Sequence, residues 1–332
     1  PKPSNALGTW HCFRIPISTS THAVIITSKA DRMGFLANFI MRGYSQAALV
    51  TTTSALLALI FPVIGIISSG ALTLVSLQVG AKNALQVLII SVTASIFFTL
   101  ITFNTALPVL MFVLLLWLPM LSLGFVLRIS RSLSFTIQIG LAFGILLIAV
   151  LYLGLENPQL QWVQLLEPLL SDFNKTGLLD QPDNQTFLLV FSAWMSGILA
   201  AGFYLQLIIS LLLARNWQAQ LYNPGAFINE FANMRMHSSL AVITVLTFII
   251  AYYQNLMTPV LVRDVALLLL PLWFIQGLAV IHGVILQTIL HSMWVVVLYF
   301  ILIILTVPAV TFVTFIGLVD VVFDFRGKLG SG

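Results

Sequence analysis

The stretch LSFTIQIGLAFGILLIAVLYLGL, residues 133–155, decides what kind of fold this chain adopts. It contains no charged residue, and a helix of about 20 apolar residues crosses the ~30 Å hydrocarbon core of a bilayer. Its apolar residues do not alternate with polar ones, as they would in a strand of a membrane barrel. Because backbone groups in lipid must bond internally, the stretch predicts a transmembrane helix.

The composition extends this prediction to the whole chain. Of 332 residues, 60% are hydrophobic and only 7% are charged, against roughly 25% charged in a typical soluble domain. A soluble fold could not cover such a chain with polar surface, so we expect an all-α, polytopic bundle of helices in a lipid bilayer. The formal net charge is +4, but the basic residues are spread between the apolar runs. They form no cluster that would bind nucleic acid.

Hydropathy predicts about eight or nine spans in a single transmembrane domain, residues 33–326. We expect a leader, residues 1–32, that is either a misassigned extension before Met33 or a disordered tail, and a short tail, residues 327–332. The first two spans are a helical hairpin or one kinked, re-entrant element, because Pro62 and Gly65 interrupt them. The predicted spans are residues 45–60, 62–79, 84–103, 106–127, 133–155, 187–213, 240–257, 265–285 and 293–319.

Lys and Arg residues in the short loops predict the orientation. If the spans alternate, one side collects the basic residues as far as the sixth span, and this side should be the cytoplasm. These residues are Arg42, Lys82, Arg128, Arg131, Arg215 and Arg235. Nine spans would place Arg326 and Lys328 outside, whereas eight would keep them inside.

Two loops are long enough to carry structure. The outer loop, residues 156–186, is acidic and contains apolar residues at near-helical spacing between 160 and 170. It therefore predicts an amphipathic helix on the membrane surface or capping the bundle. The inner loop, residues 214–239, contains the turn signal Asn223-Pro-Gly225 before Phe227 and Phe231, whose spacing fits one face of a short helix.

The sequence contains no catalytic motif, so we expect no enzyme activity, and it predicts neither a cofactor nor a metal site. Its single cysteine, Cys12, excludes an internal disulfide framework. Gln276 and His282 are polar residues inside a predicted span, where such side chains bond between helices or face a cavity. Bonding between helices is the favoured interpretation. Two acids have plainer interpretations. Asp264 at a helix edge can snorkel with Arg263, which is favoured over a coupled-ion site. Asp320 is either a buried carboxylate or a marker of the membrane interface, and the interface is the favoured interpretation.

Three stretches carry a family resemblance: Gly80-Ala-Lys-Asn-Ala-Leu85, Gln276-Gly-Leu-Ala-Val-Ile-His-Gly283 and Gly317-Leu-Val-Asp-Val-Val-Phe-Asp-Phe-Arg326. With the inner loop from Asn223 to Arg235, they resemble the YybS-like family of bacterial membrane proteins, grouped as domain of unknown function 2232 (DUF2232). The resemblance implies a multi-pass protein of the bacterial inner membrane, without assigned catalytic residues. The first six spans also look like the substrate-binding S components of energy-coupling-factor (ECF) vitamin transporters, although this chain adds about three helices.

Two functional hypotheses follow. In the first, the protein is a small-molecule binding or transport component whose pocket opens toward the outer side and is lined by Asn104, Gln276 and His282. In the second, it is a membrane scaffold or cell-envelope protein that presents its inner loop to a membrane protein partner. The contact residues in that loop would be Phe227, Phe231 and Arg235.

Overall fold

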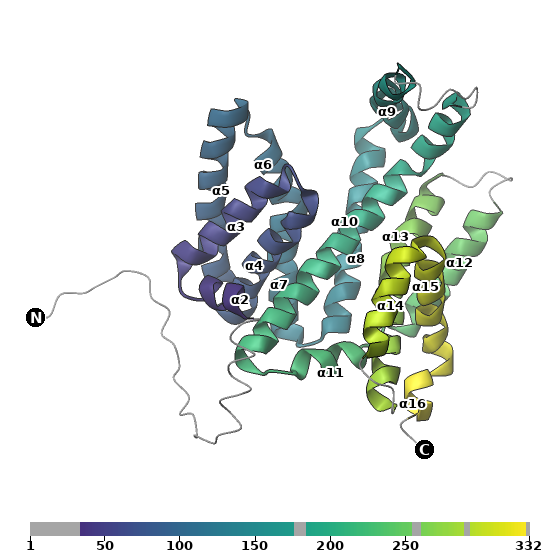
Figure 1. Cartoon of the computed structure of the whole chain (residues 1–332). Helices are drawn as coiled ribbons and strands as arrows, with labels where there is room; N and C mark the ends of the chain where they lie inside the picture. The colour runs from purple at the N-terminus through teal and green to yellow at the C-terminus, as the bar shows by residue number, and fades with distance from the viewer. Residues whose placement is uncertain (1–33, 176–183, 254–259, 289–292, 330–332) are drawn as a thin grey trace, which may run out of the picture. The chain divides into compact units, whose positions relative to one another are not determined.

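The computed structural model describes residues 34–175, 184–253, 260–288 and 293–329 (Figure 1). Every regular element in these ranges is a helix. Six of the described helices are long and apolar enough to cross a membrane, and three shorter apolar helices accompany them. The protein is therefore a multi-pass helical membrane protein, as its composition predicts. The expected leader lies outside the described residues.

The described helices pack into two compact units. Unit 1 comprises Pro1–Thr136 and Gln206–Glu230, and unit 2 comprises Ile137–Leu205 and Phe231–Gly332. One helix of 39 residues, α10 (Asn184–Tyr222), contributes to both. Hydropathy shows where spans lie but not which spans pack together, so the division could not be predicted from it.

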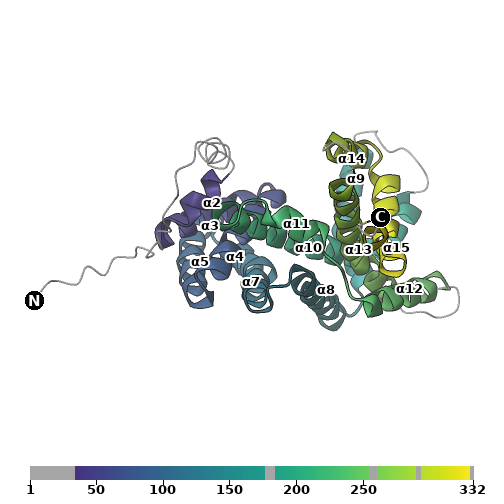
Figure 2. The ribbon, with the colours of Figure 1, turned by 90° about the horizontal axis from the view of Figure 1, so that it is seen from below.

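Unit 1 contains the first four predicted spans. A short turn, Pro62–Ile64, separates the first two spans, so they form a hairpin rather than one kinked element. In this unit α4 lies between its neighbours α3, α5 and α7 (Figure 2). The helices are α2 (Phe35–Ile40), α3 (Tyr44–Ala58), α4 (Gly65–Gln78), α5 (Ala81–Phe103), α6 (Leu107–Phe112) and α7 (Leu118–Ser130), with a π-helical turn, Val113–Trp117, joining the last two.

On α5 of unit 1, several small polar residues are buried while several large apolar ones are exposed. On α5, Ser91, Ser95 and Thr99 are buried, whereas Phe97 and Ile101 are about 70% exposed. Small side chains let helix backbones approach closely, and their hydroxyls bond between helices where lipid offers no partner. The Ser69 hydroxyl on α4 bonds to that of Ser210 on α10 at 2.8 Å, and the Trp117 indole donates to Ser68 Oγ at 3.0 Å. This arrangement is the one expected for helices surrounded by lipid.

Unit 2 is built around α13, which packs most closely against α15. A Cβ atom added at Gly277 of α13 would lie 1.9 Å from the carbonyl oxygen of Val313, and one added at Gly317 would lie 2.1 Å from that of Trp273. Only glycine at both positions allows this separation of the two backbones. The further helices are α8 (Leu133–Gly154), α9 (Pro158–Lys175), α11 (Ala226–Ala232), which crosses the unit boundary, α12 (Ser238–Tyr252), α13 (Val260–Gln287), α14 (Met293–Ile304), α15 (Thr306–Phe323) and α16 (Phe325–Leu329).

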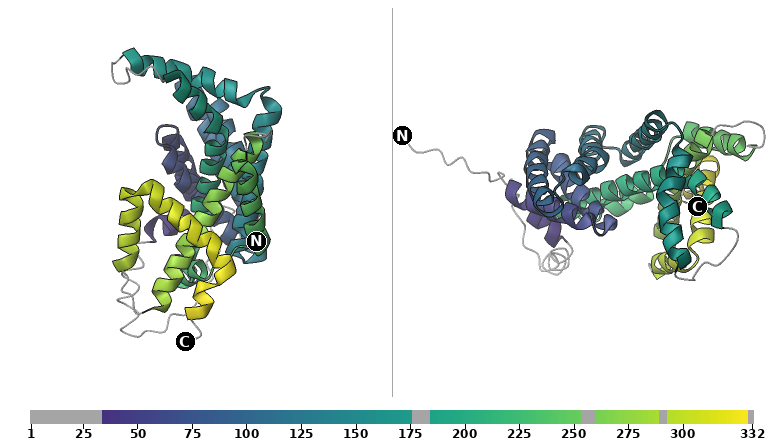
Figure 3. Two further views of the ribbon diagram at one scale, coloured as in Figure 1. Left: turned by 90° about the vertical axis from the view of Figure 1, so that its right-hand side faces the viewer. Right: turned by 90° about the horizontal axis from the view of Figure 1, so that it is seen from above.

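The last predicted span, residues 293–319, is wrong as a single helix. It consists of α14 and α15, and the chain changes direction between them (Figure 3). Pro308 explains the break, because proline lacks an N–H and its ring clashes with the carbonyl four residues earlier, here that of Ile304. Hydropathy does not register one proline inside such an apolar run.

Both long loops contain the helices that the sequence predicts. In the outer loop α9 forms, and Trp162 donates from its indole to Ser196 Oγ on α10 at 2.8 Å. This contact favours the interpretation of α9 as a cap on the bundle. In the inner loop α11 follows a turn at Gly225, where φ is +89°. The preceding helix continues to Tyr222, nine residues beyond the predicted end at 213, because Ala214 and Trp217 are still buried.

Candidate functional site

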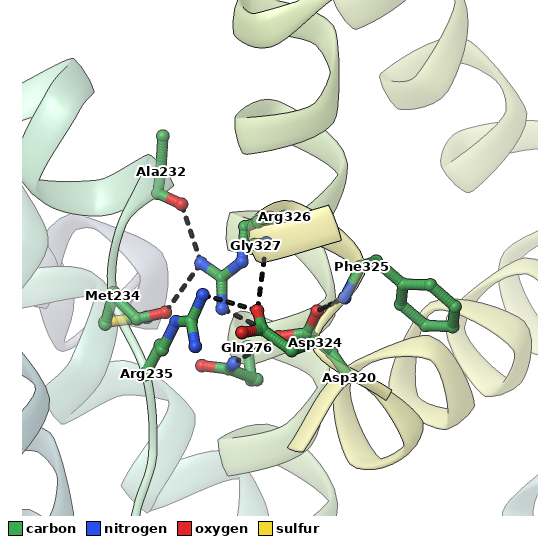
Figure 4. Close-up of polar contacts among 9 residues, drawn as sticks. All are labelled: Ala232, Met234, Arg235, Gln276, Asp320, Asp324, Phe325, Arg326 and Gly327. Atoms are coloured by element: carbon green, nitrogen blue, oxygen red, sulfur yellow. Dashed lines mark hydrogen bonds and ion pairs between the residues drawn. The ribbon is translucent and has the colours of Figure 1, made fainter. Parts of the chain in front are cut away.

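Three of the stretches that carry the family resemblance meet at one end of unit 2 (Figure 4). They are the end of the inner loop, the middle of α13 and the end of α15 with α16. Their polar side chains and several backbone groups form a network, which we call the buried polar cluster. Its members are Ala232, Met234, Arg235, Gln276, Asp320, Asp324, Phe325, Arg326 and Gly327.

Arg326 is the centre of this cluster. Its Nη2 forms an ion pair with Asp320 Oδ2 at 2.7 Å, and both side chains are only 2% exposed. Its Nη1 donates to the carbonyl oxygens of Ala232 at 2.7 Å and Met234 at 2.8 Å. A buried charge is stable only when paired and hydrogen-bonded, so these partners fix the C-terminal segment to the end of the inner loop. The Asp320 carboxylate is buried in the protein, which agrees with the less favoured interpretation of this residue as a buried carboxylate.

Two members at the edge of the cluster, Arg235 and Asp324, form an ion pair that is exposed. Arg235 Nη2 lies 2.5 Å from Asp324 Oδ1, with the two side chains 52% and 45% exposed. The Arg235 guanidinium and then the backbone N–H of Gly327 hold the pKa of Asp324 below its usual value. Asp324 ends α15 in the left-handed conformation, with φ at +45°. Asp accepts this conformation more readily than most residues, which explains its position at the end of the helix.

Of the predicted ligand contacts, Gln276 is packed inside this cluster. Its Nε2 donates to Asp320 Oδ2 at 3.3 Å, and the residue is 1% exposed. His282 lies six residues after Gln276 on the same helix, α13. Its Nδ1 donates to the Leu278 carbonyl of that helix at 2.8 Å. Its ring also meets those of Phe231, with 5.5 Å between centroids, and Tyr299, at 6.0 Å. Gln276 thus bonds between α13 and α15, as the favoured interpretation expects, whereas the hydrogen bond of His282 stays within α13.

The remaining predicted residues lie elsewhere. Asn104 belongs to unit 1, where it ends α5 with φ at +53° and is exposed. Asn104 therefore belongs to a different unit from Gln276 and His282. Phe231 packs against His282 and is buried, whereas Phe227 on α11 is half-buried. Their roles as ligand or partner contacts stay predictions.

Asp264, at the opposite end of unit 2, does not snorkel as predicted. The residue is fully buried, and its Oδ2 accepts a hydrogen bond from the Tyr152 hydroxyl at 2.7 Å. Arg263 turns away from it, bonding to the Ala193 carbonyl on α10 and lying 4.6 Å from the centroid of the Trp194 ring. The adjacent acid and base are thus used separately, each to join α13 to a neighbouring helix.

Unit 1 contains a polar cavity of about 370 Å³ where the ends of α4, α7 and α10 meet. We call it the arginine cavity, because Arg128, Arg131 and Arg215 line it. Gln78 and Gln218 complete its polar wall, and two leucines complete the apolar part. Unit 2 has larger cavities, of about 550 and 630 Å³, but their walls are almost entirely apolar.

A chain of hydrogen bonds fixes the side chains on one wall of the arginine cavity. Arg215 bonds through Nε to Glu230 Oε2 at 2.7 Å and through Nη1 to Gln218 Oε1 at 2.5 Å. Gln218 in turn donates to Gln78 Oε1 at 3.1 Å. On another wall, Arg128 Nη1 donates to the Leu77 carbonyl near the end of α4 at 3.2 Å. The cavity is thus preformed by contacts within unit 1.

Sequence reasoning used the three cavity arginines only as topology signals. It missed that they converge, because Arg128 and Arg131 lie at the end of α7 whereas Arg215 lies on α10, 84 positions after Arg131. It also missed the Asp320–Arg326 pair. A signal for that pair was present, since an acid six residues before an arginine at the end of a span can bond to it when the chain turns between them.

The comparisons with known proteins give no further identification: no family model, no curated protein and no solved structure matches this chain. The resemblance to the YybS-like family and to ECF S components therefore stays a prediction.

Proposed function

We propose that this protein is a non-enzymatic binding component of the bacterial inner membrane that takes up a small molecule in the arginine cavity of unit 1. The observation that carries the proposal is the cavity itself. It is a preformed polar space of about 370 Å³ at the ends of three otherwise apolar helices. Ligand sites are concave, with a few convergent polar groups, and occur between the helices of bundles.

Two points support this assignment over a site in unit 2. Gln276 and Asp320 of the buried polar cluster are bonded to each other, so the cluster serves packing. The resemblance to S components concerns the first six spans, and unit 1 contains the first four of them. The proposed pocket lies at the basic end of unit 1, whereas the sequence predicted a pocket opening toward the acidic outer side.

Native mass spectrometry of the full chain, purified in mild detergent, tests the proposal. We expect a bound small molecule on the wild-type protein and its loss from Gln218→Phe, which fills the cavity. Gln86→Phe is the matched control, because Gln86 is exposed on α5 and does not line the cavity. A molecule retained equally by both variants, or a wild-type protein that never carries one, would refute the proposal.

The topology that we propose has eight crossings followed by a hairpin. The crossings are α3, α4, α5, α6 with α7, α8, α10, α12 and α13. The hairpin consists of α14 and α15, because the chain changes direction between them (Figure 3). Arg326 contacts Ala232 and Met234, so the C-terminal segment lies at the same end of unit 2 as the inner loop. A fluorescent reporter fused to the C-terminus should therefore fold on the cytoplasmic side, and an exported C-terminus would contradict this topology.

A second candidate function is a scaffold that uses the inner loop. It is favoured by the exposure of Ile228 on α11, which is 54% exposed in a loop otherwise held at its end by Arg326. Deleting the loop would also remove the partners of Arg326 and is therefore a poor test. Ile228→Glu, with Asn223→Glu as the exposed control, is sharper: a partner captured by cross-linking should be lost from the first variant only. Equal capture by both would exclude this use of α11.

A further inference from the structure

The arginine cavity has an excess of positive charge that its own walls do not neutralise. Three arginines line it, and within the described residues the only carboxylate bonded to any of them is that of Glu230, which pairs with Arg215. Arg128 bonds to the backbone carbonyls of Ser76 and Leu77, which carry only partial negative charge. Two of the three positive charges thus lack an anionic partner among the residues that the structure describes.

Most donors of these arginines also remain available. Arg215 bonds through Nε and Nη1, so its Nη2 has no hydrogen-bond partner within the described residues, and Arg128 bonds only through Nη1. Arg131 ends α7 in the left-handed conformation, with φ at +53° and its backbone N–H bonded to the Leu127 carbonyl at 2.9 Å. Within the described chain its guanidinium has no hydrogen-bond or ion-pair partner, although it lines the cavity.

The backbone leaves room for this arrangement. Gly80, just before α5, has φ at +114°, and a Cβ atom there would lie 3.3 Å from Arg128 Nη1. A side chain at this position would be strained and would press on the guanidinium. Glycine therefore lets Arg128 lie across the turn between α4 and α5, beside the cavity.

We propose that the arginine cavity binds a phosphate group, carried either by an anionic lipid or by a small soluble phosphate ester. Guanidinium groups match phosphate oxygens with paired, charge-assisted hydrogen bonds, and several arginines around one space are typical of phosphate recognition. Basic pockets between transmembrane helices on the cytoplasmic side bind lipid headgroups by the same chemistry. The inference rests on the proposed function and names the ligand class of that site.

The test compares two phosphate sources on the full-length protein. The lipid arm places the protein in nanodiscs of phosphatidylcholine with or without phosphatidylglycerol and counts retained lipids by native mass spectrometry. The soluble arm titrates inorganic phosphate and pyrophosphate against the detergent-solubilised protein and follows the thermal midpoint. We expect at least one source to bind, and Arg131→Gln to weaken that binding about tenfold or more.

Arg42→Gln is the matched control. It removes the same charge from an exposed position of unit 1 that does not line the cavity, so it should bind like the wild type. Phosphatidylglycerol retention alone would identify a lipid headgroup, and a response to phosphate alone would identify a soluble ester. Equal weakening by Arg42→Gln, or no binding of either source, would overturn the phosphate inference. A retained molecule without phosphate that is lost from Gln218→Phe would overturn it too, while leaving the proposed function intact.

Discussion

Arg326 and Arg131 are the same residue type used in opposite ways. In unit 2, Arg326 is buried with a carboxylate partner and two carbonyl partners, so its charge is fully accounted for inside the fold. In unit 1, Arg131 lines a cavity with no carboxylate bonded to it within the described residues. The comparison teaches that an arginine's neighbours, rather than its presence near a membrane, separate a structural role from a binding role.

The largest effect that this comparison predicts is at Arg326. Replacing it by Ala leaves Asp320 buried without its partner, and breaking a buried ion pair in this way costs about 3–5 kcal/mol. We therefore expect a large fall in the thermal unfolding midpoint in detergent. The double variant Asp320→Leu with Arg326→Met should recover much of the loss, because it removes both charges.

Lys328→Ala is the control for this experiment. Lys328 is an exposed cation two residues further on, with its Nζ 5.6 Å from the centroid of the Phe323 ring. Exposed contacts of this kind are worth about 0.5–1 kcal/mol. If Arg326→Ala unfolds at the same temperature as Lys328→Ala, the buried polar cluster does not hold unit 2 together.

The next effect concerns the helix contact that brings the cluster together. Gly277→Ala would place a Cβ atom 1.9 Å from the Val313 carbonyl oxygen, so α13 and α15 must separate. Such overpacking typically costs about 1–3 kcal/mol. Gly202→Ala is the control, because a Cβ atom there meets nothing within 4 Å. Similar unfolding midpoints for the two variants would show that the close approach is not required.

These contacts also show what the sequence could and could not predict. Length and apolarity identify the helices, because crossing a bilayer demands both. They do not reveal the break at Leu305, where a single proline outweighs the surrounding apolar residues, or the extension of α10 past Leu213. Polar residues in spans drew attention to Gln276 and His282, but pairing requires knowledge of which helices touch. Asp320 with Arg326, and the three cavity arginines, become visible only once those contacts are known.

A smaller effect is expected when an arginine of the cavity loses its charge. Arg128 bonds to carbonyls at the end of α4, an interaction with the helix dipole worth about 0.3–1 kcal/mol. Arg128→Gln should therefore lower the unfolding midpoint only slightly, while weakening phosphate binding as Arg131→Gln does. A loss of stability as large as that of Arg326→Ala would remove the distinction between the two regions.

The smallest effect is the pH dependence at the edge of the cluster. Arg235 lowers the pKa of Asp324 in the folded protein, so their pair stabilises the fold above the unfolded carboxyl pKa of about 3.9. This contribution is lost as the pH falls through the lower pKa of the folded state. Wild type and Asp324→Asn should therefore differ in unfolding midpoint at neutral pH and converge in acid.

Salt should narrow the difference in unfolding midpoint between wild type and Asp324→Asn, because the Arg235–Asp324 pair is about half exposed. It should leave the loss caused by Arg326→Ala nearly unchanged, since that pair is only 2% exposed. If salt reduced the effects of Asp324→Asn and Arg326→Ala equally, water would reach Arg326. Arg326 would then not differ from the cavity arginines in the way described above.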